Sequence, residues 1–256
     1  NGEMTGTTWI EESGLLEGPI MITNTHSVGI VRDAVIAWRM KQGKMMQPWS
    51  LPVVAETWDG YLNDINGFHV KETHAFQALE SASGGAVAEG NVGGGTGMIC
   101  HGFKGGIGTA SRKIEANAGG YTLGVLVQAN YGLRQQLRIA GAPIGLEITE
   151  NTLRSQDDGS IIIVVGTDAP LLPHQLKRLA RRAALGLARL GSTSGNGSGD
   201  IFIAFSTANE DAGAPTGTLS LTMLPNERMN ALFEATIQAT EEAIVNALVA
   251  AETMAG

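Results

Sequence analysis

A run of β-branched residues that begins directly after a polar segment constrains this chain more than any other feature. Ser160 opens the run Ile161-Ile162-Ile163-Val164-Val165, and Gly159 ends the polar stretch that begins at Glu150. Consecutive branched residues fit a strand in the middle of a sheet that is covered on both faces. The run therefore predicts a rigid central strand whose first residue is a serine.

Apolar periodicity and glycine or proline punctuation predict further elements along the chain. Helices are expected over residues 25–38, 70–83, 173–191 and 229–254. Strands are expected over residues 20–23, 51–55, 121–130, 201–205 and 218–223, with residues 137–139 pairing back against the strand that ends at Asn130. Two strand-rich layers between helices, without regular strand–helix alternation, indicate an α+β fold of the αββα sandwich type. A length of 256 residues fits one layered domain.

Composition and charge exclude several classes of protein. A net charge of −8, with 17 basic residues and no aromatic residues interleaved among them, does not suit a nucleic-acid binder. No apolar run approaches the roughly 18 residues that span a bilayer, so no membrane partner is expected. The lone Cys100 excludes an internal disulfide and a cysteine-cluster zinc site. The basic residues of the helix over 173–191 are interpreted as a solvated face: Lys177, Arg178, Arg181 and Arg182.

Glycine is unusually frequent, with 35 residues, which predicts many tight turns or close backbone approaches. The densest stretch runs from Gly85 to Gly108 and lacks the GxxxxGK[ST] pattern of a phosphate-binding loop. A nucleotide site is therefore not expected there.

The tripeptide Asp158-Gly159-Ser160 has two interpretations. Asp-Gly is a common turn pair, so the plain interpretation is a hairpin turn. The sharper one is autoproteolysis, because glycine tolerates the backbone distortion that lets a serine hydroxyl attack the preceding carbonyl. Ser160 would then carry a free α-amine, whose ordinary pKa of about 7.7–8.0 suits a base for its own hydroxyl near neutral pH.

A second constellation, Ser198-Gly199-Asp200, places a hydroxyl and a carboxylate two residues apart at the entrance of a predicted strand. It is either a polar turn or a hydroxyl–carboxylate pair that orients a nearby nucleophile and exchanges protons with it. The histidines give no support to a triad or a metal site, because none lies in a GxSxG or HExxH setting: His26, His69, His74, His101 and His174.

Seven stretches resemble the L-aminopeptidase/D-amino-acid esterase and β-peptidyl aminopeptidase family. They are NGEMTG from Asn1, WIEESGLLEGP from Trp9, TNTHSVGIVRDAV from Thr23, ETWDGYLNDING from Glu56, FKGGIGTASR from Phe103, GVLVQANYG from Gly124 and DGSIIIVVGTDAPL from Asp158. This resemblance implies an N-terminal-nucleophile hydrolase fold and a precursor that cuts itself into a large part, residues 1–159, and a small part, residues 160–256. It also implies no metal or organic cofactor and a homo-oligomer of cleaved pairs.

The resemblance further implies roles for particular residues. Cleavage falls between Gly159 and Ser160, Ser160 is the nucleophile, and Ser198 is the family's second serine. Asp200 occupies the place of the family's usual glutamate and is one methylene shorter. The remaining residues implied are Asn130 as the oxyanion donor, Tyr61 as its assistant and Glu56 as the carboxylate that holds the substrate's free amino group. For Glu56 the plain interpretation is a surface carboxylate at a strand end.

The expected substrates are small peptides, amino-acid amides or esters. Two other interpretations stay open: an acyltransferase of related fold, against which a serine rather than a threonine at position 160 argues, and an uncleaved relative that binds small ligands without catalysis. The first residue is Asn1 rather than Met, so the chain is expected to be a fragment of its precursor. The compartment consequently stays open between cytoplasm and periplasm.

Overall fold

A computed structural model describes residues 2–43, 45, 47–153 and 159–254. The helices in this part are α1 (Thr7–Ser13), α2 (Val28–Gln42), α3 (Glu72–Glu80), α4 (Ile144–Glu147), α5 (Pro173–Arg189) and α6 (Asn230–Val249). The strands are β1 (Ile20–Asn24), β2 (Val53–Thr57), β3 (Ile99–Cys100), β4 (Phe103–Lys104), β5 (Gly106–Lys113), β6 (Thr122–Asn130), β7 (Ser160–Thr167) and β8 (Ile201–Ser206). None of the described helices is long and apolar enough to cross a membrane.

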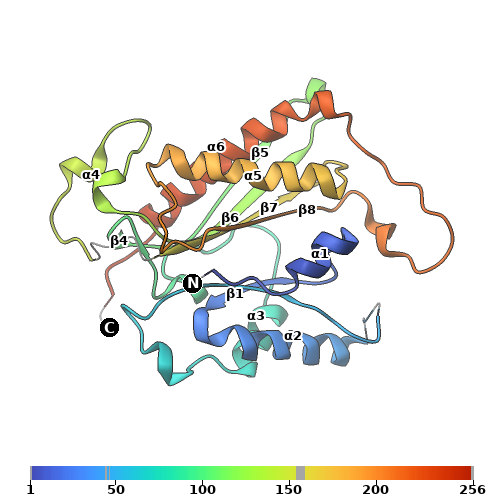
Figure 1. Cartoon of the computed structure of the whole chain (residues 1–256), viewed down its shortest axis with the longest axis horizontal. Helices are drawn as coiled ribbons and strands as arrows, with labels where there is room; N and C mark the ends of the chain where they lie inside the picture. The colour runs from blue at the N-terminus through green and yellow to red at the C-terminus, as the bar shows by residue number, and fades with distance from the viewer. Residues whose placement is uncertain (1, 44, 46, 154–158, 255–256) are drawn as a thin grey trace.

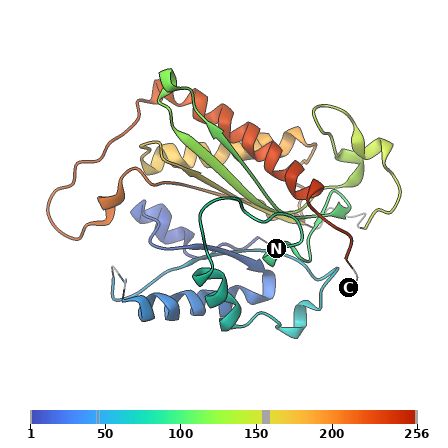
Figure 2. The same ribbon diagram turned by 180° about the vertical axis from the view of Figure 1, so that it is seen from behind.

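The elements form four layers, which confirms the predicted αββα sandwich. The helices α5 and α6 cover one face of the four-stranded sheet β5-β6-β7-β8 (Figure 1). The two-stranded parallel sheet β1-β2 faces the other side of that sheet, and α2 and α3 close the opposite surface. The view from behind shows the same order (Figure 2).

Three apolar clusters fill the spaces between these layers. The largest lies between the four-stranded sheet and α5 and α6, and includes Ile161, Ile163 and Val165 of β7. A second cluster joins the two sheets and includes Ile162 of β7. A third packs α2 and α3 against β2. The β-branched run of β7 is therefore buried on both faces, as its composition predicts.

The register of the larger sheet brings distant segments to one end. The strands β6 and β7 are antiparallel, and their pairing runs from Leu123 opposite Thr167 to Asn130 opposite Ser160. The strand β8 is parallel to β7, with Ile162 beside Ile201. The C-terminal end of β6 and the N-terminal ends of β7 and β8 thus share one edge of the sheet.

Two predicted strands do not form. Residues 137–139 do not pair with β6, because β5 and β7 already occupy both of its edges. Residues 218–223 are also outside any strand. The backbone N–H and C=O of Thr222 bond the side-chain amide of Asn209, at 2.9 and 3.0 Å, in place of a neighbouring strand. Three apolar side chains of this extended segment remain exposed, those of Leu219, Leu221 and Met223.

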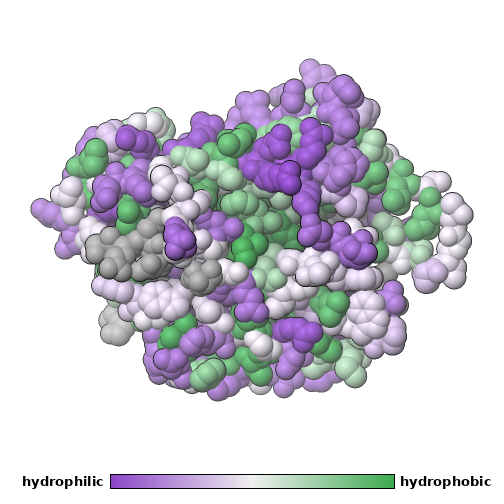
Figure 3. Space-filling view, viewed as in Figure 1, coloured by the Kyte–Doolittle hydropathy of each residue, from purple (hydrophilic) through white to green (hydrophobic). Residues whose placement is uncertain are grey.

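The basic side chains of α5 match the predicted solvated face in part: Lys177 and Arg181 are exposed, whereas Arg178 and Arg182 are half-buried. Hydrophilic side chains gather over α5 and α6 in the space-filling view (Figure 3). Arg182 and Arg178 lay their guanidinium groups over the ring of Phe233 on α6, 4.0 and 5.2 Å from its centroid. Lys177 pairs with Glu11 of α1. These cations cover apolar surface and bind within the chain.

The strand β5 is missing from the sequence prediction because its glycines are typical of a loop. In the structure they permit close packing: a Cβ placed on Gly108 would lie 1.9 Å from the carbonyl oxygen of Ala243 in α6. The backbone of α6 therefore rests directly on β5. Glycine here marks a close approach of helix to strand.

We expect Gly108→Ala to destabilise the fold, because its methyl group must push α6 away from β5. Overpacking of this kind costs about 1–3 kcal/mol of the free energy of unfolding. In a protein of this size each kcal/mol lowers Tm by about 2–4 °C. Gly124→Ala in the neighbouring strand β6 is the matched control, because a Cβ there meets nothing within 4 Å. Equal Tm values for the two variants would contradict the packing account.

Candidate active site

Ser160 is the first residue of β7 and lies at the shared edge of the larger sheet. Its side chain is fully buried, and its Oγ has no hydrogen-bond partner within the described part of the chain. Asn130 of β6 lies directly opposite in the register, and both residues point to the face toward the β1-β2 sheet. A buried hydroxyl without a partner is costly in a purely structural position, so it indicates a functional one.

The peptide bond before Ser160 is held by the third segment at this edge. The carbonyl oxygen of Gly159 accepts a hydrogen bond from the backbone N–H of Gly199 at 3.1 Å. Gly199 in turn touches the chain near its start, because a Cβ on Gly2 would lie 2.9 Å from the Cα of Gly199. A backbone donor is therefore already directed at the carbonyl where the sequence predicts cleavage. The predicted hairpin residue Asp158 lies outside the described residues.

The predicted pair in the same loop also meets. Ser198 Oγ donates to Asp200 Oδ1 at 2.6 Å, so the carboxylate reaches the second serine although it is one methylene shorter than a glutamate. The other oxygen, Asp200 Oδ2, is buried and has no hydrogen-bond partner within the described chain. The loop thus forms both a turn, with Ser198 N–H bonded to Gly195 O, and a hydroxyl–carboxylate pair beside the Gly159–Ser160 bond.

The side-chain amide of Asn130 is fixed by two backbone groups. Its Nδ2 donates to the carbonyl of Trp58 at 2.7 Å, and its Oδ1 accepts from the N–H of Ile99 at 2.8 Å. These bonds set which end of the amide carries the N–H donors. Asn130 lies directly opposite Ser160 in the strand pairing, so its amide is held beside the residue that the sequence predicts to be the nucleophile.

Glu56 of β2 is fully buried, so the interpretation as a surface carboxylate is wrong. Its Oε1 accepts the backbone N–H groups of Gly2 and Glu3 at 2.6 and 2.8 Å, and its Oε2 accepts the hydroxyl of Thr25. An ionised carboxylate offers about four acceptor positions, so these three donors leave room for one more. Thr25 and the two amides escaped the sequence analysis because nothing local to Glu56 indicates them.

The remaining predicted site residue, Tyr61, lies in the loop after β2. Tyr61 is 56 % exposed, so it lies at the surface, whereas Ser160, Asn130 and Glu56 are buried. The loop itself is fixed by Asp59, whose carboxylate accepts from the side-chain amides of Asn24 and Asn63 at 2.8–3.2 Å. This anchor determines where Tyr61 emerges.

The histidines remain apart from this constellation. His101 is buried in the core with its ring edge-on to Tyr131, and its Nδ1 bonds the carbonyl of Leu133 at 3.0 Å. Among the described side chains, no group of three or more His, Cys, Asp or Glu residues gathers closely enough to hold a metal ion.

Burial shifts the pKa of three groups near this end of the sheet. Burial raises the pKa of Tyr131 well above its ordinary value, and Cys100 and Asp200 raise it further. Burial lowers the pKa of Lys104 to about 8, although the nearby Cys100 opposes that shift. Burial also lowers the pKa of Arg134, which donates to the carbonyls of His101, Gly102, Ile148 and Glu150. Arg134 therefore fixes the segment that leads toward the bond before Ser160.

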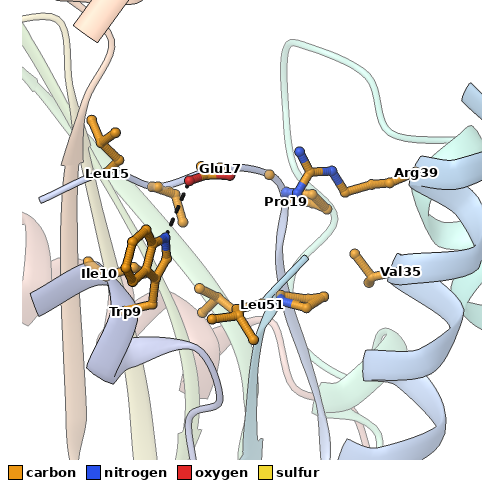
Figure 4. A pocket seen from close by; sticks show the side chains of 12 residues that line it. Trp9, Ile10, Leu15, Glu17, Pro19, Val35, Arg39 and Leu51 are labelled. Carbon is orange, nitrogen blue, oxygen red and sulfur yellow. Dashed lines mark hydrogen bonds between the residues drawn. The ribbon is translucent and has the colours of Figure 1, made fainter. Parts of the chain in front are cut away.

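A small pocket lies elsewhere, between α1, the C-terminal half of α2 and the segments that lead into β1 and β2 (Figure 4). Trp9, Leu51 and Arg39 are among its lining side chains. It opens at the N-terminal ends of β1 and β2, whereas Glu56 lies near the C-terminal end of β2. Three residues of strand from Val53 to Glu56 span roughly 10 Å. The pocket is thus separate from the groups around Ser160.

Comparison with known sequences gives close relatives. The sequence model for peptidase family S58 matches residues 1–256. The β-peptidyl aminopeptidase BapA of Sphingosinicella microcystinivorans is 56% identical over 271 residues, which covers 100% of this chain and 68% of the relative. The BapA of Sphingosinicella xenopeptidilytica is 49% identical over 272 residues, again with 100% and 68% covered.

Solved structures agree with this assignment. A β-aminopeptidase from a Burkholderia species superimposes with a TM-score of 0.92 at 52% identity, over 99% of this chain and 72% of the other. The L-aminopeptidase D-Ala-esterase/amidase from Ochrobactrum anthropi, described as a variant among the Ntn hydrolase fold, gives a TM-score of 0.92 at 51% identity, over 100% and 72%. The chain therefore belongs to peptidase family S58, and it is a hydrolase of the aminopeptidase type with the N-terminal-nucleophile fold.

Proposed function

We propose that this aminopeptidase cuts itself between Gly159 and Ser160 and then uses Ser160 to remove N-terminal residues from small peptides, amides or esters. The observation that carries the proposal is the Gly159 carbonyl, which accepts the Gly199 N–H directly beside the buried, unbonded Ser160 hydroxyl. A nucleophile, its target carbonyl and a donor for the developing charge are thus adjacent before any cut is made.

Processing would proceed by an acyl shift. Ser160 Oγ attacks the Gly159 carbonyl carbon, and its proton passes to the Ser160 nitrogen as the C–N bond breaks. The oxyanion formed on Gly159 is stabilised by the Gly199 N–H that already binds this oxygen. Water then hydrolyses the resulting ester, which leaves a carboxylate on Gly159 and a free α-amine on Ser160.

The two parts would remain one domain after the cut. Residues 1–159 contribute β6 and residues 160–256 contribute β7, and these strands pair along their full common length from Leu123–Thr167 to Asn130–Ser160. The largest core cluster also draws on both parts. We expect a tightly associated pair, and the resemblance of the whole chain favours a homo-oligomer of such pairs.

Turnover would repeat the same chemistry on a substrate. The α-amine of Ser160 takes the proton of its own hydroxyl as Oγ attacks the scissile carbonyl, and the same proton is passed to the leaving amine. Asn130, assisted by Tyr61, stabilises the oxyanion, and water then releases the acyl group from Ser160. The Ser198–Asp200 pair orients the nucleophile and carries protons beside it.

Glu56 supplies the preference for a free amino terminus in this proposal. A buried carboxylate with one acceptor position left can bind a substrate ammonium through a charge-assisted hydrogen bond. The names of the relatives support this substrate class, since they describe a β-peptidyl aminopeptidase and an L-aminopeptidase D-Ala-esterase/amidase. No cofactor is needed for any of these steps.

The test is Glu56→Gln. Glutamine keeps a carbonyl for the N–H groups of Gly2 and Glu3, and its amide can donate to the Thr25 hydroxyl, so the contacts within the chain are kept while the charge and the free acceptor position on Oε2 are lost. Hydrogen bonds to charged groups contribute about 1.5–3 kcal/mol, so we expect kcat/KM for free amino-acid amides to fall by roughly 10- to 100-fold. Self-cleavage should proceed as in the parent chain. N-acetylated amides are the control, and equal activity on acetylated and free substrates by the parent enzyme would remove Glu56 from this role.

A further inference from the structure

Tyr131 brings a buried hydroxyl to the same end of the sheet as Asp200. It immediately follows Asn130, and its side chain is fully buried. Its hydroxyl is among the few buried polar atoms without a hydrogen-bond partner in the described chain, and so is Asp200 Oδ2. Neither Tyr131 nor the second carboxylate oxygen is used by the steps above.

The sheet register brings these two residues to one edge of the larger sheet. Along β6 the residues Val127 and Ala129 point toward α5 and α6, and Tyr131 continues this alternation two residues later. Asp200 directly precedes β8, whose first residue, Ile201, lies beside Ile162 of β7. Since the end of β6 and the start of β8 flank β7, Tyr131 and Asp200 both lie at the edge of the sheet where β7 begins.

The tyrosine ring is held firmly in this position. The ring of His101 packs edge-on against it at a centroid distance of 4.9 Å, and the N–H of His101 donates to the carbonyl of Tyr131 at 2.7 Å. The negative charge of Asp200 is close enough to add to the effect of burial in raising the pKa of the Tyr131 phenol. The phenol consequently stays protonated at neutral pH and can act only as a neutral donor or acceptor.

We infer that Tyr131 is a positioning residue whose hydroxyl donates to a bridging water molecule that in turn donates to Asp200 Oδ2, and so fixes the carboxylate that binds Ser198. One oxygen of Asp200 accepts from Ser198, and the other would accept from this water. Two buried polar atoms that each lack a partner are satisfied together by this contact. The inference rests on the proposed role of Ser198 and Asp200 beside Ser160.

The experiment compares Tyr131→Phe with Asp200→Asn and with the double variant. Phenylalanine keeps the ring packing on His101 and removes only the hydroxyl. We expect kcat and the rate of self-cleavage to fall roughly 10- to 100-fold, as for a lost hydrogen bond to a charged group, with KM unchanged. The double variant should be no slower than Asp200→Asn alone, because Tyr131 acts through Asp200. Tyr121→Phe, directly before the first residue of β6, is the matched control and should behave as the parent chain.

Each outcome separates this inference from the proposed function. Full activity of Tyr131→Phe together with impaired Asp200→Asn would overturn the role of Tyr131 and leave the proposed function intact. Losses that simply multiply in the double variant would likewise show that Tyr131 acts independently of Asp200. Full activity of Asp200→Asn would instead remove the Ser198–Asp200 pair from the mechanism. A higher Tm for Tyr131→Phe without any kinetic change would show that the hydroxyl is a buried group without a hydrogen bond and does not position Asp200.

Discussion

Ser160→Ala should remain a single uncut chain and should hydrolyse no amino-acid amide above background. The substitution removes the atom that we propose to attack in both processing and turnover, so both reactions should stop together. Removal of a catalytic serine lowers kcat on the order of 10⁶-fold in enzymes that use one as nucleophile. Because the methyl side chain of alanine replaces a buried hydroxyl without a partner, the fold should keep its Tm.

The control for this variant is Ser111→Ala, an exposed serine on β5 of the same sheet. It should be processed and should hydrolyse amides as the parent chain does. Two fragments from Ser160→Ala would assign the attack to another group, and turnover by an uncut Ser160→Ala chain would exclude a mechanism that needs the new α-amine.

Asn130→Ala should lower kcat by about 10²- to 10³-fold, which corresponds to about 2.7–4 kcal/mol of lost transition-state stabilisation. The amide lies opposite Ser160, and its orientation is fixed by Trp58 and Ile99. Because the oxyanion forms only during reaction, KM should change far less than kcat. Steady-state kinetics on an amino-acid amide measures both constants.

The same substitution also leaves two backbone groups without their partner, so stability must be measured beside activity. Each unsatisfied buried group costs about 1–3 kcal/mol, and Tm should fall. Gln128→Ala is the matched control, because this buried amide lies two residues upstream on the same face and bonds Thr23 and Thr57. It should lower Tm and keep kcat. Equal losses of kcat in both variants would attribute the effect of Asn130 to packing.

Much of the fold was predictable because several segments carry strong local signals. The β-branched run of β7, the proline start of α5 and the alternation of β6 each identify their element. The strand β5 was hidden because Gly106 and Gly108 make contacts with α6 and a neighbouring loop that only the packed structure reveals. The segment over residues 218–223 shows the reverse case. Its apolar alternation is typical of a strand, but the backbone of Thr222 bonds the side chain of Asn209 and no sheet forms.

The site was predictable where one short segment contains the chemistry. Ser198 and Asp200 meet as their spacing suggests, and Gly159 and Ser160 lie together by covalent necessity. The Gly199 N–H at the Gly159 carbonyl could not be predicted, because backbone donors have no sequence signature. Tyr131 and Thr25 could not be predicted either, since their importance depends on which buried atoms the fold places around them.

The central claim, cleavage between Gly159 and Ser160, is tested most directly by the intact mass of the purified protein with N-terminal sequencing of its smaller fragment. We predict two fragments, of which the smaller begins Ser160-Ile161-Ile162, and a single uncut mass for Ser160→Ala. A parent chain that stays uncut over days, or a fragment that begins at another residue, would contradict the account.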